Sequence, residues 1–128
     1  MGRYVSIRGW LELDDELTNE VKSAIEQSPT QSENFGVSPE DAEFYIKGWT
    51  IPSDYINWTR YIFYGADIRL QGLKFMKSLL EKIAQIQLAD GGDIDFVTGV
   101  FFIDDEGEDR LSLLWEIKEG QLIEISRK

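Results

Sequence analysis

Residues 4–13 read YVSIRGWLEL, and apolar side chains return at every second position along most of this stretch. The apolar residues that share one side of the extended chain are Val5, Ile7, Leu11 and Leu13. The residues between them are mainly polar. A period of two over this length is typical of a β-strand with one face buried. The stretch therefore predicts a half-buried strand that opens a β-sheet.

Two helices are expected to cover this sheet. The first begins at an N-cap supplied by Asp14 or Asp15 and ends at Ser28-Pro29. The second is predicted by apolar side chains that recur at helical spacing over residues 73–86. Just beyond it, Gly91-Gly92 offers the left-handed conformation that a helix C-cap requires.

The remaining pattern predicts one loop and five further strands. The loop covers residues 29–41, which are polar and rich in turn formers. The strands are expected at residues 43–51, 58–68, 96–103, 111–117 and 122–125. The strand at 58–68 is apolar on both faces through its middle, as expected of a central strand, and Glu119-Gly120 signals a tight turn between the last two strands.

The resulting order, β-α-β-β-α-β-β-β, predicts a single α+β domain over residues 1–128. Its first six elements follow the order of the ferredoxin-like sandwich, in which two helices cover one face of an antiparallel sheet. The last two strands are expected to extend that sheet as a C-terminal β-meander.

Composition favours a binding protein and excludes several partners. The chain of 128 residues carries 24 acidic and 13 basic residues, a formal charge of −11. Binding to nucleic acid or to anionic membrane surfaces depends on Lys and Arg, so neither is expected as a partner. The sequence has no apolar run long enough to span a membrane and no apolar signal segment at its start, which predicts a cytoplasmic protein.

The absence of His and Cys argues against catalysis. His is the commonest general base and a frequent metal ligand, and Cys supplies thiolate nucleophiles and metal ligands. The sequence also lacks the usual phosphate-binding and nucleophile motifs. We therefore expect no enzyme, no cofactor and no metal, although a small enzyme that uses paired carboxylates stays an alternative.

The acidic residues gather in two stretches without any basic residue, at 23–46 and 83–109. Clustered charge of this kind can steer a basic partner, although it also serves simple solvation. The second stretch ends on a predicted hairpin tip whose carboxylates are Asp104, Asp105, Glu106, Glu108 and Asp109. They are expected to dock Arg and Lys side chains of a partner, with a merely solvated tip as the alternative. A calcium site is disfavoured because the run departs from the EF-hand pattern.

Aromatic residues supply the second group of candidate binding residues. Trp10, Tyr45 and Trp49 fall on the polar sides of their predicted strands, which would place them on the open face of the sheet. Trp and Tyr are enriched at binding hot spots. The alternative is that the C-terminal strands or the loop at 29–41 cover them and form a second small core. Trp58 and Trp115 continue apolar faces and are expected to pack inside.

Three segments carry a resemblance to a known group of proteins. They are the opening strand that ends in Gly9-Trp10, the stretch GVFFIDDE at 99–106, and LWEIKEGQL at 114–122. In these segments the chain resembles the small immunity proteins of bacterial polymorphic-toxin and contact-dependent growth inhibition systems. The resemblance implies a cytosolic, non-catalytic protein that binds and neutralises a cognate toxin domain, often a basic nuclease.

A function of a different class stays open beside this one. A ferredoxin-like domain whose open face carries Trp10, Tyr45 and Trp49 could bind a small molecule, or regulate another protein, or form a homodimer. The sequence leaves the oligomeric state undetermined.

Overall fold

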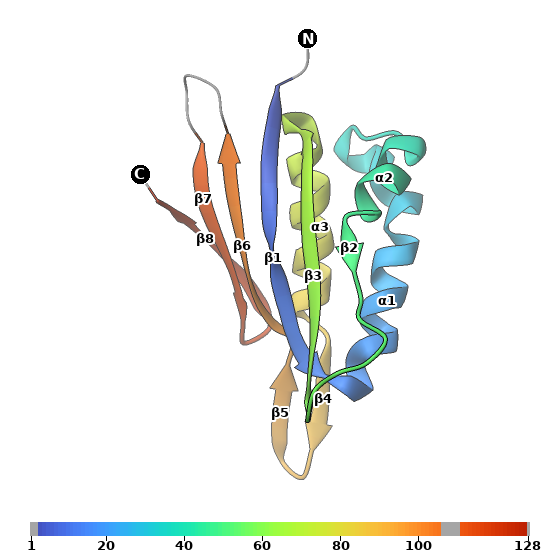
Figure 1. Ribbon diagram of the computed structural model, residues 1–128, viewed down its shortest axis with the longest axis vertical. Coiled ribbons are helices and arrows are strands. Elements are labelled where there is room, and N and C mark those ends of the chain that lie inside the picture. Colours follow the sequence, from blue (N-terminus) through green and yellow to red (C-terminus); the bar gives the residue numbers. More distant parts are fainter. Residues whose placement is uncertain (1–2, 106–110, 128) are drawn as a thin grey trace.

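A computed structural model describes residues 3–105 and 111–127 of the protein (Figure 1). Its α-helices are α1 (Thr18–Gln27), α2 (Pro39–Ile46) and α3 (Leu73–Ala84). Three 3-10 helices precede or follow them: η1 (Asp15–Leu17), η2 (Ser28–Phe35) and η3 (Leu70–Gly72). The strands are β1 (Tyr4–Asp14), β2 (Trp49–Thr50), β3 (Thr59–Arg69), β4 (Gln87–Asp90), β5 (Asp93–Phe96), β6 (Thr98–Asp105), β7 (Ser112–Lys118) and β8 (Gln121–Ser126).

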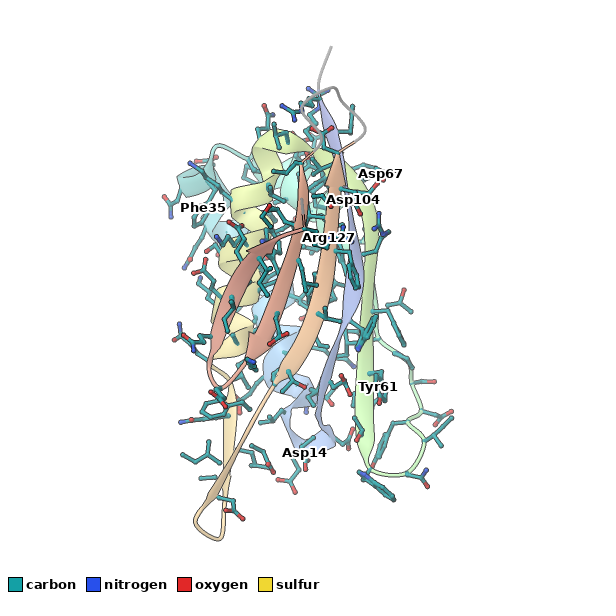
Figure 2. The ribbon with its side chains drawn as sticks, turned by 90° about the vertical axis from the view of Figure 1, so that its left-hand side faces the viewer. Asp14, Phe35, Tyr61, Asp67, Asp104 and Arg127 are labelled. Atoms are coloured by element: carbon teal, nitrogen blue, oxygen red, sulfur yellow. The ribbon has the colours of Figure 1, made fainter. Side chains whose placement is uncertain are left out.

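Six strands form one antiparallel sheet in the order β2-β3-β1-β6-β7-β8, and β4 pairs with β5 in a separate hairpin. The helices lie on one side of the large sheet, and its other side is left uncovered (Figures 1 and 2). The predicted α+β class and the antiparallel sheet are therefore confirmed. None of the helices in the described chain has the length and apolar character needed to cross a membrane.

The core lies between the sheet and the helices, and the opening strand contributes to it as its alternation predicts. Val5, Ile7, Leu11 and Leu13 are each 4% exposed or less. The predicted cap residue caps η1 and not α1: the Asp14 carboxylate accepts a hydrogen bond from the backbone N–H of Glu16 at 2.9 Å, whereas Leu17 precedes α1 without a side-chain cap. The chain passes through η1 before α1 begins.

The predicted strand at residues 43–51 is wrong. Its first half belongs to α2, whose N-terminus is capped by the Ser38 hydroxyl, which accepts a hydrogen bond from the Asp41 backbone N–H at 3.1 Å. Ala42 and Tyr45 lie three residues apart, so both side chains point from α2 into the core. Only the two residues of β2 pair with β3.

Three further features differ from the prediction. The segment predicted as a loop at 29–41 holds most of η2 and the first residues of α2. The helix predicted over residues 73–86 is α3, which ends at Ala84. Gly91 and Gly92, with φ of 57° and 97°, turn the β4–β5 hairpin instead of capping that helix. The C-cap prediction is therefore wrong, and β6 starts later than expected because Phe96 belongs to β5.

The C-terminal meander follows the prediction. β6, β7 and β8 are antiparallel neighbours, and Lys118 pairs with Gln121 across a two-residue turn. The turn residues Glu119 and Gly120 have φ of 52° and 82°, the positive values that a tight hairpin turn of this kind requires. Trp115 of β7 is 0% exposed, which confirms that it packs inside.

One buried side-chain polar atom has no hydrogen-bond partner among the described residues, the indole N–H of Trp49. The ring itself packs well, since its centroid lies 4.9 Å from that of Tyr64 and 6.1 Å from that of Phe101. An unbonded buried donor costs about 1–3 kcal/mol. The ring of Trp49 is therefore stabilising and its N–H is not.

Replacing Trp49 with phenylalanine is therefore expected to change the free energy of unfolding by less than about 1 kcal/mol, because losing the unbonded donor offsets the smaller ring. Urea unfolding measures the effect. The control is Trp115→Phe, which removes an indole N–H that donates to Glu124 at 2.9 Å, and should cost more. Equal losses in the two variants would contradict the prediction.

Candidate functional site

The uncovered side of the sheet carries a row of aromatic and apolar side chains. Strand register places Phe63 of β3, Trp10 of β1 and Val100 of β6 side by side across the sheet. Phe63 is 45% exposed and Tyr61 is 42% exposed, and their rings are stacked with centroids 6.4 Å apart. Figure 2 shows Tyr61 on the side of the sheet opposite the helices. Exposed aromatic side chains gathered on one face are typical of a binding surface.

Four residues of β1 and β3 form what we call the aromatic face: Trp10, Glu12, Tyr61 and Phe63. Together they line an open depression of about 540 Å³. The Trp10 indole N–H donates to the Glu12 carboxylate at 3.3 Å, which holds the charge of Glu12 beside the rings. The aromatic face therefore combines flat apolar surface with one carboxylate.

A second depression continues from the same carboxylate toward the ends of the strands. It has a volume of about 360 Å³ and brings together the end of β1, the start of β3, β5 and the start of β6. We call it the acidic hollow. Its residues are Glu12, Leu13, Asp14, Trp58, Thr59, Asp95, Phe96 and Thr98. The prediction that Trp58 packs inside is wrong, since it is 80% exposed at the rim of this hollow.

The carboxylates of the acidic hollow are Glu12, Asp14 and Asp95. None of them forms an ion pair with a cation of residues 3–105 or 111–127. Among the described residues, the Asp14 carboxylate accepts the capping hydrogen bond given above and no other, and Asp95 of β5 is exposed. This end of the sheet therefore presents negative charge that the described chain does not neutralise.

The predicted acidic tip has a different environment at its base. Asp105 is 7% exposed and is bound by Arg3. Asp104 accepts hydrogen bonds from Arg8, from Arg127 at 2.7 Å and from Ser112 at 3.1 Å. These two carboxylates therefore tie β6 to neighbouring parts of the same chain. The other three predicted tip residues, Glu106, Glu108 and Asp109, lie outside the described residues.

Two of the predicted open-face aromatics lie on the core side, so that placement is wrong. Tyr45 is 7% exposed and faces the core from α2, where its backbone carbonyl accepts a hydrogen bond from the Tyr64 hydroxyl at 2.8 Å. Trp49 packs on Tyr64 and Phe101. Burial raises the pKa of both the Tyr45 and the Tyr64 hydroxyl. Of the three, only Trp10 lies on the open face.

The arginines around Asp104 also set its ionisation. The hydrogen bond from Arg8 holds the pKa of the Asp104 carboxyl below its ordinary value of 3.8, and Arg127 and Ser112 act in the same direction against the effect of burial. Asp15 and Glu124 have lowered pKa values for the same kind of reason, through Arg60 and through Trp115.

Acid is therefore expected to weaken the fold partly through Asp104. Its pKa is lower in the folded than in the unfolded chain, so its contribution is present above the ordinary value of 3.8 and is lost as the pH falls through the folded value. Asp104→Asn should flatten the fall in unfolding free energy between about pH 5 and about pH 2, measured by urea unfolding. A slope in Asp104→Asn equal to that of the wild type would contradict the prediction.

Most residues of the candidate site were not among those predicted from the sequence. Tyr61 and Phe63 lie in the stretch YIFY, which is apolar on both faces, so its pattern did not reveal that their side of β3 is exposed and that of Ile62 and Tyr64 is buried. Asp95 and Trp58 carried no signal either, because only the folded chain brings β5 and the start of β3 to the end of β1.

In the described part of the chain, no group of three or more acidic, His or Cys side chains is arranged to hold a metal ion. Comparisons with protein-family models, with curated proteins and with solved structures returned no match to this chain. What the protein binds is therefore inferred from the chemistry of its own surface.

Proposed function

We propose that this chain is a cytoplasmic, non-catalytic protein that binds and neutralises a basic bacterial toxin domain, in the manner of an immunity protein. One observation carries the proposal: on the side of the sheet that the helices leave uncovered, exposed aromatic rings lie beside carboxylates that form no ion pair within the described residues. The binding surface comprises the aromatic face and the acidic hollow, and Trp10 is the predicted residue that it retains.

The aromatic rings support the binding of a protein. Tyr and Trp are enriched among residues that dominate binding energy, because they bury large area at little entropic cost. Trp10, Tyr61 and Phe63 lie together on an antiparallel sheet whose strands fix their backbone. A partner that covers them would bury apolar surface without any rearrangement of the fold.

The carboxylates support a basic partner over a nucleic acid. Open sheets with aromatic residues also stack the bases of single-stranded RNA, but such sites carry Lys and Arg for the phosphates. Here Glu12 lies among the rings and Asp14 lies in the adjoining hollow. Together with a formal charge of −11, this surface repels phosphate and attracts a basic protein.

The strand order supports a ferredoxin-like core for this proposal. In the order β2-β3-β1-β6, β3 lies between β2 and β1, as in a split β-α-β arrangement. β7 and β8 would then extend that core beyond β6 and enlarge the uncovered face. A broad sheet face of this kind suits a protein partner, whereas small molecules usually bind in enclosed pockets.

Co-expression with the product of the adjacent upstream gene tests the proposal. The two proteins are expected to co-purify as a complex, and the chain is expected to protect cells from that product. The association rate should fall steeply as salt rises, because opposite charges steer the encounter. The absence of both complex and protection would refute the proposed function.

A further inference from the structure

We infer that the aromatic face and the acidic hollow together bind an arginine- or lysine-rich segment of the protein partner, with its cationic side chains lying on the rings and bonded to the carboxylates. The inference rests on the proposed function for the identity of the partner. It adds to that function the binding surface and the chemistry of the segment.

The described residues make the same contact among themselves. The Arg60 guanidinium lies 4.8 Å from the centroid of the Tyr55 ring and pairs with the Asp15 carboxylate at 2.7 Å. A second example lies at the other end of the open face. The Arg127 guanidinium lies 5.1 Å from the centroid of the Phe102 ring and donates to the Asp104 carboxylate at 2.7 Å. Figure 2 shows Arg127 beside Asp104. One guanidinium therefore satisfies a ring and a carboxylate at the same time.

The aromatic face offers an equivalent pair of groups. Glu12 is held beside the rings by the indole N–H of Trp10, and Tyr61 lies directly across from Glu12 in the strand register. Within residues 3–105 and 111–127, no cation lies over these rings or pairs with Glu12. The Tyr61 ring and the Glu12 carboxylate could thus hold a guanidinium as Phe102 and Asp104 hold that of Arg127, and no cation of the described residues occupies this position.

The acidic hollow extends this site from one cation to several. Glu12 belongs to both depressions, and beyond it come Asp14 and Asp95 with the exposed ring of Trp58. A partner segment that runs from the aromatic face into the hollow would pass three carboxylates and rings at both ends. This favours a chain segment with several basic residues over a single buried cation.

Charge also argues for such a segment over a second copy of this chain. A second copy would have to supply cations to Glu12, Asp14 and Asp95. Of the arginines on the open face, Arg8 and Arg127 are already bonded to Asp104, and Arg69 lies over the Tyr4 ring at 5.9 Å from its centroid. A partner with its own unpaired basic residues meets the requirement directly.

The four tryptophans provide a direct test with internal controls. The probe is a synthetic (Arg-Gly)₄ peptide, titrated into the ¹⁵N-labelled protein while the four indole N–H signals are recorded by NMR. The signals of Trp10 and Trp58 are expected to shift. Those of the buried Trp115 and of Trp49, whose N–H is enclosed in the core, should stay in place. Stationary Trp10 and Trp58 signals would overturn the inference.

Two variants that lose the same number of charges localise the effect. Glu12→Gln/Asp14→Asn/Asp95→Asn is expected to weaken peptide binding about tenfold, and asparagine retains the capping function of position 14. The control, Glu20→Gln/Glu26→Gln/Glu33→Gln, removes three exposed carboxylates on the helical side and should weaken binding less than about threefold. Equal losses in the two variants would mean that only net charge matters, and would overturn the inference.

The same variants separate this inference from the proposed function. If the toxin complex forms but both triple variants bind the toxin equally well, the inference is wrong and the function stands. If the peptide maps to Trp10 and Trp58 but no toxin binds, the surface is supported and the function is wrong. If the free protein sediments as a dimer that Phe63→Ala dissociates, the occupant is a second copy and the inference is wrong.

Discussion

Replacing Gly9 with alanine is expected to lower the free energy of unfolding by about 3 kcal/mol or more. A Cβ atom on Gly9 would lie 2.1 Å from the carbonyl oxygen of Val100 and 2.7 Å from the Cα of Phe101. Both are backbone atoms of β6, so no side-chain rotation relieves the clash. β1 and β6 would have to separate at the centre of the sheet, where Gly9 pairs with Phe101 on one side and with Tyr64 on the other.

Gly65→Ala is the matched control, because a Cβ atom there meets nothing within 4 Å. This exposed glycine lies in β3, opposite Arg8 of β1. Its replacement should leave stability unchanged or raise it by about 0.5 kcal/mol, since alanine restricts the unfolded chain. Urea unfolding of both variants measures the difference. A Gly9→Ala midpoint equal to that of the wild type would show that the two strands are not in such close contact.

Local sequence patterns predicted the elements that have one dominant periodicity. β1 alternates cleanly and was predicted over nearly its whole length. The segment at 43–51 carried two competing patterns, alternation through Phe44 and Ile46 and helical spacing through Ala42 and Tyr45. The buried pair is Ala42 and Tyr45, whereas Phe44 is 67% exposed. The Ser38 cap that begins α2 was the signal that separated the two.

Glycine pairs and strand ends were ambiguous for a different reason. Gly91-Gly92 suits both a helix C-cap and a hairpin turn, since each requires positive φ. Trp58 shares the phase of the buried Ile62, but it precedes the first residue of β3 and is not held by the sheet. Pattern alone does not reveal where a strand stops pairing, because its neighbours come from distant parts of the sequence.

The candidate site was predicted only in part for the same reason. The position of Trp10 on the open face followed from the alternation of β1, whereas the basic partner stays a proposal based on charge. The acidic hollow depends on residues from position 12 to position 98, which meet only when β1, β3, β5 and β6 are assembled. At the predicted acidic tip, Arg3 and Arg8 come from the start of the chain to bind Asp105 and Asp104.

Replacing Trp115 with alanine is expected to lower the free energy of unfolding by about 3–5 kcal/mol, a large part of the stability of a domain of this size. The ring is 0% exposed on β7, against which α3 packs. Its N–H donates to Glu124 of β8 at 2.9 Å, and Glu124 also accepts from Lys77 of α3 at 3.3 Å. The substitution would leave a cavity and break the link that joins the meander to α3.

Trp58→Ala removes the same side chain where it is 80% exposed, and it should change stability by less than about 0.5 kcal/mol. Urea unfolding compares the two variants, and titration with the arginine peptide compares their binding. We expect opposite profiles: Trp115→Ala loses stability, while Trp58→Ala stays folded and loses peptide affinity. Because the deleted atoms are identical, any difference must come from the surroundings of each ring. A stable Trp115→Ala variant, or a Trp58→Ala variant that unfolds, would contradict the placement of these rings in the core and on the binding surface.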